Sequence, residues 1–260
     1  MSLSLPGPSM NDASPSPVSV SPELRPFSES LNPAPLRHLG RRHDAAGTFL
    51  PEPGNTVVCH LVEGSASHAA VLEARAALLD LPEARERLAA TPASSLHMTL
   101  FQGIIEFRRD WPFWPKDIPA DTPVETMTAH YLERLAGFTP GRAFAMRPKA
   151  LTPNGLVLVP VDAASAISLS DWRDRLSEVF GYRHPDHDDY AFHVTFAYLR
   201  RRLSDEAIRA WDAAVPGILD KLARAAPVIE LAPPAFCRFE DMKHFEELLV
   251  LDGREGERFA

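Results

Sequence analysis

Two short segments far apart in the chain carry the same pattern, and they limit what these 260 residues can fold into more than any other feature. Each is a His-x-Thr inside an apolar run, the first at 95–101 and the second at 191–197. Apolar and polar residues alternate in both, which is typical of a half-buried strand. Residues on one strand face lie about 6.5–7 Å apart, so each strand presents an imidazole beside a hydroxyl. We expect the two strands to face each other across a cleft.

The paired histidines, His97 and His193, suit a reaction that needs one general base and one general acid, because imidazole titrates near neutral pH. A phosphodiester is the natural substrate: one ring deprotonates the attacking water or hydroxyl, and the other protonates the leaving oxygen. Thr99 and Thr195 would donate hydrogen bonds to the phosphate oxygens. This chemistry predicts a metal-independent phosphoesterase without a cofactor. The alternative is two structural histidines, each hydrogen-bonded within a sheet.

Residues next to the motifs are candidates for substrate binding. Tyr190 precedes the second motif and could reach the cleft, although a core or rim position is the alternative. Phe101 shares the strand face of His97 in a regular alternation, where it could stack on a base. The arginines at 200–202 could attract an anion, although such a run is usually solvated, and we expect His60 to be structural.

The segment 184–189, with the sequence His-Pro-Asp-His-Asp-Asp, offers a different kind of site. Imidazoles bind transition metals, and carboxylates bind these ions or Mg²⁺. Its His-x-x-His spacing lacks a helix or turn that would fix the rings, and no second cluster completes it. We therefore predict no metal site and keep a metal-dependent hydrolase as an alternative. Motifs of serine hydrolases, P-loop NTPases and dinucleotide-binding enzymes are absent from the sequence.

The segments His97–Leu100 and His193–Phe196 resemble the paired His-x-Thr/Ser signature of the two-histidine (2H) phosphoesterases. That superfamily includes 2′-5′ RNA ligase-like proteins and cyclic nucleotide phosphodiesterases, and residues 53–60 also resemble a bacterial branch of unassigned function. The resemblance implies a bilobal α+β fold with helices outside and two antiparallel sheets, related by a pseudo-two-fold axis, around a cleft. It implies a catalytic role for the motif histidines and phosphate binding for the motif threonines. Hydrolysis or ligation, and a non-catalytic module that binds a nucleotide or RNA end, stay open.

Composition divides the chain into three parts. Residues 1–30 are rich in Ser and Pro and predict a disordered tail. Residues 31–54, broken by Pro and Gly, predict an irregular extension. Residues 55–260 predict one bilobal domain in which a plan of strands and helices occurs twice, with one His-x-Thr strand in each half. Hydrophobic residues make up 45% of the chain, which is enough for a core.

Charge limits the partners. A net charge of −8 argues against an extended nucleic-acid surface, so we expect a small nucleotide-type phosphoester or an RNA end as the ligand, and a monomer. The two cysteines do not form a metal-binding pair by spacing, no apolar stretch approaches the length of a membrane span, and no secretory signal is recognisable. We expect a cytoplasmic bacterial protein.

Local patterns also predict individual elements. We expect a capping box at Thr122–Glu125 before one helix, another helix that begins at Ser170, and a third that is capped by Ser204 and is bent or ended by Pro216. Strands are expected at 56–62, 142–151, 156–161, 228–231, 236–241 and 246–251.

Overall fold

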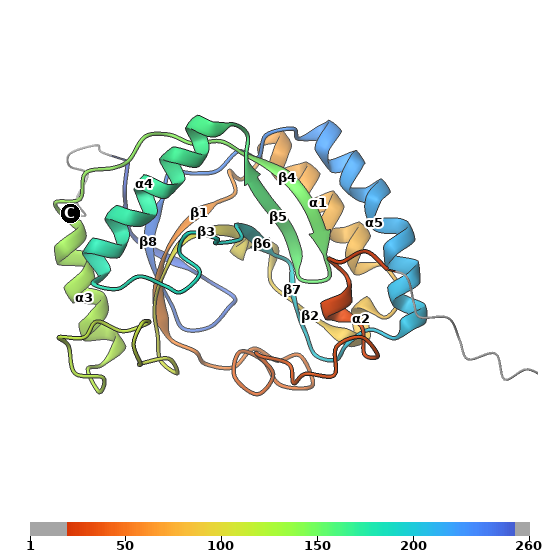
Figure 1. Cartoon of the computed structure of the whole chain (residues 1–260), viewed down its shortest axis with the longest axis horizontal. Coiled ribbons are helices and arrows are strands. Elements are labelled where there is room, and N and C mark those ends of the chain that lie inside the picture. Colours follow the sequence, from red (N-terminus) through yellow and green to blue (C-terminus); the bar gives the residue numbers. More distant parts are fainter. Residues whose placement is uncertain (1–19, 253–260) are drawn as a thin grey trace, which may run out of the picture.

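The computed structural model of the chain describes residues 20–252, and this part has an α+β architecture with antiparallel sheets, as predicted (Figure 1). A seven-stranded sheet has the order β4-β5-β6-β3-β1-β8-β9, and a two-stranded sheet pairs β2 with β7. The strands are β1 Gly54–His60, β2 Leu88–Ala90, β3 His97–Ile105, β4 Met146–Thr152, β5 Gly155–Pro160, β6 His193–Thr195, β7 Ala197–Leu199, β8 Ala235–Phe239 and β9 Glu246–Val250. The expected strand at 228–231 forms only isolated bridges.

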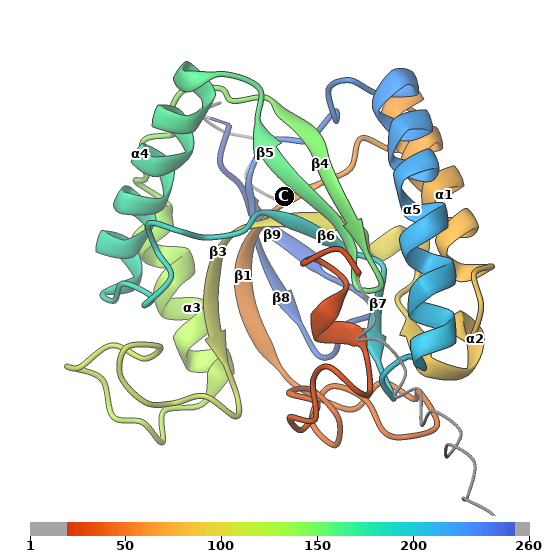
Figure 2. The ribbon, with the colours of Figure 1, turned by 45° about the vertical axis from the view of Figure 1, so that its right-hand side comes forward.

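Helices cover the sheet in two pairs on opposite flanks (Figure 2). The long helices α1 (Ala66–Leu79) and α5 (Asp205–Ala225) contact each other on one flank. On the other flank α3 (Val124–Leu135) contacts α4 (Ala163–Phe180), and the short α2 (Ala84–Arg87) follows α1. None of the helices within residues 20–252 combines the length and the apolar character that a bilayer crossing requires.

Helix starts depend on caps, and one predicted start and one predicted cap are wrong. The helix α4 begins seven residues before Ser170, because the Asp162 side chain accepts a hydrogen bond from the Ser165 amide at 2.7 Å and satisfies a free N–H of the first turn. The capping box at Thr122 is absent. Pro123 occupies the N-cap position of α3 and makes no side-chain cap.

The cap of α5 is the predicted one, since Ser204 Oγ accepts from the Ala207 amide at 3.2 Å. Pro216, however, neither ends nor divides the helix, which continues to Ala225. A proline inside a helix removes one backbone hydrogen bond. Trp211 before it and Leu222 after it are both buried, and this burial on one helix face offsets the loss.

The motif strands β3 and β6 are neighbours in the large sheet and pair at Met98 and Val194, both fully buried. This single pair joins strands β4-β5-β6 to strands β3-β1-β8-β9. Both motif strands therefore lie in the same seven-stranded sheet, whereas the sequence analysis expects them to face each other from two sheets. The pseudo-two-fold axis and the cleft between two sheets stay predictions.

The N-terminal extension is folded against the domain. Of the predicted tail, residues 1–19 lie outside the described residues, but residues 20–30 contain a 3₁₀ helix, η1 (Arg25–Phe27), and bury Leu24 and Phe27. Residues 20–30 are thus not a disordered tail, because these apolar side chains join the core. The boundary at residue 55 stays a prediction.

The arginines at 200–202 help to hold this extension. Arg200 donates to the Ala45 carbonyl at 2.8 Å, and Arg202 donates to the carbonyls of Pro26 and Ala34, both at 2.6 Å. Two of the three arginines therefore bind backbone carbonyls and are not free to attract an anionic ligand.

Candidate functional site

Both His-x-Thr motifs line one cavity of about 410 Å³. His97 and Thr99 come from β3, and His193 and Thr195 come from β6. Alternation places these four side chains on the face opposite to buried Met98 and Val194. Because β3 and β6 are adjacent, the sheet itself brings the two motifs together.

The two imidazoles are fixed in the same way by the local backbone. His97 Nδ1 lies 2.7 Å from the Ser95 carbonyl oxygen, and His193 Nδ1 lies 2.7 Å from the Ala191 carbonyl oxygen. A carbonyl can only accept, so each Nδ1 carries the proton in this bond. In the neutral ring, Nε2 is then the nitrogen with the free lone pair, which leaves it available to accept or return a proton.

The surroundings of the two rings differ. His97 is half-buried, with its ring centroid 4.1 Å from that of Phe245 and 5.9 Å from that of His60. Burial lowers the pKa of His97 to about 3, with smaller contributions from His60 and His193, and the bond to Ser95 opposes the shift. His97 is therefore uncharged at neutral pH, whereas His193 is exposed to solvent.

Tyr190 lines the same cavity, and a buried arginine holds it there. The Arg173 guanidinium lies 4.2 Å from the Tyr190 ring centroid and donates to the Leu100 carbonyl at 2.7 Å and to the His187 carbonyl at 3.2 Å. Burial raises the pKa of Tyr190 to about 12. The phenol is therefore protonated near neutral pH and can donate a hydrogen bond into the cavity.

Phe101 does not line the cavity, so its predicted stacking on a base is wrong. Its side chain is fully buried, with ring centroids 5.0 Å from both Phe180 and His184. The cause is a β-bulge: along β1, Val57 pairs with Phe101 but Val58 pairs with Thr99, which leaves Leu100 as an extra residue. An extra residue reverses the alternation, and Gln102 faces the cavity instead.

The two histidines of the 184–189 loop are committed to different contacts. His184 is buried among aromatic rings, including Phe101 and Phe113, and burial lowers its pKa to about 3. His187 Nε2 lies 3.1 Å from Asp174 Oδ1. Across residues 20–252, no three or more His, Cys, Asp or Glu side chains gather in a group that could hold a metal ion.

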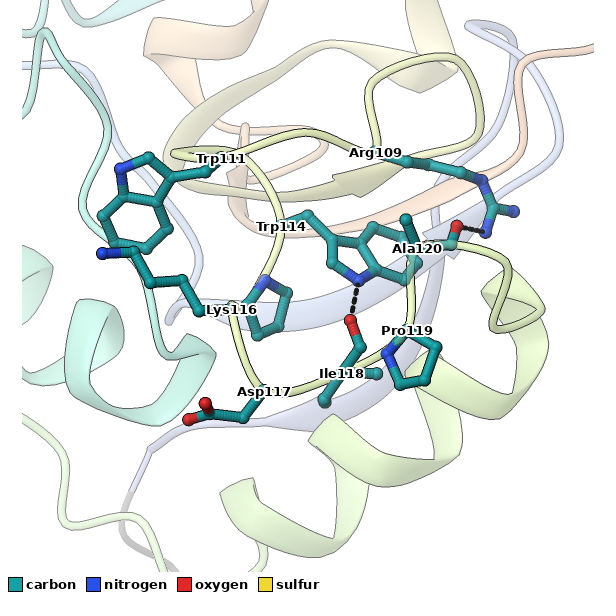
Figure 3. Close-up of a pocket in the computed structure, with 9 residues that line it drawn as sticks. Arg109, Trp111, Trp114, Lys116, Asp117, Ile118, Pro119 and Ala120 are labelled. Carbon is teal, nitrogen blue, oxygen red and sulfur yellow. Dashed lines mark hydrogen bonds between the residues drawn. The ribbon is translucent and has the colours of Figure 1, made fainter.

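A second hollow lies within the Trp- and Pro-rich segment after β3, at 109–120 (Figure 3). Its polar groups are mostly engaged: Trp114 Nε1 donates to the Ile118 carbonyl and Arg109 Nη1 donates to the Ala120 carbonyl, both at 2.9 Å. The Lys116 ammonium lies 4.0 Å from the Trp111 ring centroid. The hollow has no histidine and shares no lining residue with the histidine cavity, so it has no imidazole that could transfer a proton near neutral pH.

Comparison with known proteins agrees with this geometry. Residues 42–157 match the family 2H-phosphodiest, described as a domain of unknown function (DUF1868). The chain belongs to the 2H phosphodiesterase family. The matched segment contains the first motif and ends before the second. Membership supports a phosphoesterase-type function with a small phosphoester as substrate.

One solved structure is similar over nearly the whole chain. It is the conserved protein of unknown function ATU0111 from Agrobacterium tumefaciens str. C58, with 50% sequence identity and a TM-score of 0.87. The similarity covers 90% of this chain and 100% of that chain. Among curated proteins, none matches.

Several cavity residues are absent from the sequence prediction. Gln102 is hidden by the bulge, and Arg108 lies in a segment without regular structure. Arg37, His38 and Arg42 of the extension also line the cavity and were not expected there. The only signal for these three was the density of basic residues at 37–43, and nothing in the sequence placed that segment beside the motifs.

Proposed function

We propose that the protein is a metal-independent 2H phosphodiesterase that cleaves a cyclic phosphate or a 2′-5′ linkage in the histidine cavity. The observation that carries this proposal is the pair of equal 2.7 Å bonds from the two Nδ1 atoms to backbone carbonyls, in rings that line one cavity. A proton-transfer catalyst needs its reacting nitrogen oriented before the substrate arrives. We also propose that a pseudo-two-fold axis relates β3 to β6, and that the cavity is the cleft between two lobes.

His97 is the general base in this proposal. Burial keeps Nε2 unprotonated before the substrate arrives, and the negative charge of the bound phosphodiester then raises the basicity of the ring, so that it takes the proton from the attacking water or hydroxyl. His193, on the solvent-exposed strand end, is the general acid and protonates the departing sugar oxygen. The roles reverse when the reaction runs toward ligation.

Phosphate stabilisation falls to the hydroxyl groups. Thr99 and Thr195 donate to the non-bridging oxygens as charge develops in the pentavalent transition state. Tyr190, protonated near neutral pH, adds a third donor from the loop before β6. With acid, base and donors supplied by side chains, the reaction does not require a metal ion.

The test is turnover of nucleoside 2′,3′-cyclic phosphates and 2′-5′ dinucleotides in excess chelator, with products separated by chromatography. We expect hydrolysis by the wild type and a loss of about 10²–10⁴-fold in kcat for His97→Ala. His68→Ala, a histidine on α1 outside the cavity, is the control and should keep full activity. Full activity in His97→Ala contradicts the proposal. Binding without product would support a non-catalytic module, and activity only with added metal would support a metal hydrolase.

A further inference from the structure

One wall of the histidine cavity is strongly basic. Three guanidinium groups line it, from Arg37, Arg42 and Arg108. Among the described residues that line the cavity, Asp186 is the only one with a carboxylate. This is an unusual balance in a chain with a net charge of −8, and none of the three arginines has a part in the acid–base chemistry proposed above.

Arg42 is the fixed member of this arginine cluster (Arg37, Arg42 and Arg108). Its Nε donates to Glu52 Oε2 at 2.6 Å, and its Nη1 donates to the Tyr198 hydroxyl at 3.4 Å. Glu52 is itself buried, so the ion pair fixes Arg42 within the extension, and the bond to Tyr198 links the extension to β7. Glu52 is thus used by Arg42, and it forms no ion pair with Arg37 or Arg108.

Arg108 and Arg37 have no acidic partner. Arg108 Nη2 donates to the neutral Gln102 amide oxygen at 2.7 Å, its guanidinium lies 4.1 Å from the Phe113 ring centroid, and its Nε is buried without a hydrogen-bond partner. Within residues 20–252, Arg37 makes neither a hydrogen bond nor an ion pair. Arg37 and Arg42 both lower the pKa of Arg108, although burial is the larger cause, so the three cations repel one another until an anion enters.

We propose that the arginine cluster binds a second phosphate group of the substrate, distinct from the phosphoester that is cleaved at the histidines. Guanidinium groups form paired hydrogen bonds with phosphate oxygens, and a phosphate here would satisfy donors that the protein leaves free. This inference rests on the proposed function only for the place of the scissile ester. The substrate class is a phosphodiester that carries a further phosphate or diphosphate group.

The strand sets the span between the two phosphates. Gln102, which bonds Arg108, lies five residues after His97 on β3. At 3.2–3.4 Å per residue, the two positions are at most about 17 Å apart, before the side chains reach into the cavity. This upper bound leaves room for the sugar that carries the scissile ester to lie between the two phosphates.

Product-like probes test the cluster without turnover. Adenosine 2′-phosphate, adenosine 2′,5′-bisphosphate and 2′-phospho-ADP are titrated by calorimetry into the wild-type protein at fixed ionic strength. We expect at least one of the two 5′-phosphorylated compounds to bind about tenfold more tightly than the monophosphate, the effect of one added charge-assisted contact. Equal affinity for all three overturns the inference.

Variants show whether the arginines cause the gain. Arg37→Gln is the cleanest change, because this side chain supports no other contact, and Arg108→Gln is the second. Each should abolish the gain from the 5′-phosphate while leaving the affinity for adenosine 2′-phosphate unchanged, and Arg37→Lys should keep part of it. Arg224→Gln, an exposed arginine on α5, removes the same charge elsewhere and should keep the whole gain.

The inference and the proposed function can fail separately. These probes are not hydrolysed, so the titration reports on the arginine cluster even if no cyclic phosphate is ever turned over. A gain that survives in both Arg37→Gln and Arg108→Gln would overturn the inference even if hydrolysis is observed.

Discussion

The strands β3 and β6 carry the same three-residue motif in different settings. β3 is nine residues long, contains a bulge and holds a half-buried His97 against Phe245. β6 is three residues long and ends a polar loop, and His193 is exposed. The bond from Nδ1 to the carbonyl two residues earlier is nevertheless identical in the two strands.

This comparison separates two properties of the motif histidines, the direction of the ring and its burial. The direction of the ring comes from the local backbone, which is repeated in both strands. The burial of the ring comes from surrounding atoms, and these are not repeated: His97 packs on Phe245, whereas His193 is exposed. This difference is the basis of the roles proposed above, with the half-buried His97 as the base and the exposed His193 as the acid.

The largest expected effect comes from testing the acid role of His193 with two leaving groups. His193→Ala should lower kcat by about 10²–10⁴-fold on a phosphodiester whose leaving group is a sugar hydroxyl. On a nucleoside ester with a p-nitrophenyl leaving group, which departs without protonation, the same variant should lose little. The rates are compared by chromatography and by absorbance of released nitrophenolate.

The matched variant is His97→Ala, which should lose activity on both esters because the attacking group still needs a base. If the aryl ester instead rescues His97→Ala and not His193→Ala, the two strands exchange roles. Equal losses on both esters in both variants would mean that the buried and exposed histidines are not differentiated.

A smaller effect is expected from the threonines. Thr99→Val and Thr195→Val keep the shape of a β-branched side chain but remove the hydroxyl, and each should lower kcat by about 10²-fold if the hydroxyls stabilise the transition state. Thr99→Ser and Thr195→Ser restore the donor and should recover most of the rate. A loss confined to one strand would show that only that hydroxyl reaches the phosphate.

Much of the fold could be predicted because its signals are local. The alternation around His97 and His193 marked both motif strands, and the strands expected at 142–151 and 156–161 correspond to β4 and β5, which pair as a hairpin. The family resemblance drawn from these motifs is correct. Caps were less reliable, as the starts of α3 and α4 show, because several nearby residues can fill the same N-cap position.

The misplaced parts of the site depend on contacts between distant segments. The bulge at Leu100 arises from pairing with β1, and period-two alternation of a single strand cannot reveal it. The basic wall arises because η1 and the chain up to residue 53 fold back against Arg200 and Arg202. Composition made residues 20–30 resemble a disordered tail, although a few buried apolar residues such as Leu24 are enough to hold them against the domain.

The smallest effect concerns His184, a buried residue of the 184–189 loop that packs against β3, the strand of the half-buried His97. Its ring packs on Phe101 below the β3 bulge, and its Nε2 is buried without a hydrogen-bond partner. The folded state lowers the pKa of His184 to about 3, mainly through burial and then through Arg108 and Arg173. The unfolded chain has the ordinary value near 6.5, so between these values only the unfolded state takes up the proton.

Acidification from pH 7 to pH 5 should therefore cost the wild type up to about 2 kcal/mol of unfolding free energy at this position. His184→Phe keeps an aromatic ring and removes the titrating group, so its free energy of unfolding should fall less over the same interval, by up to about 2 kcal/mol. Urea unfolding at both pH values measures the difference, and contributions from other histidines cancel in it. The same pH dependence in the two proteins would mean that His184 can be protonated in the folded state. The 184–189 loop would then pack less tightly against β3 than the burial of His184 indicates.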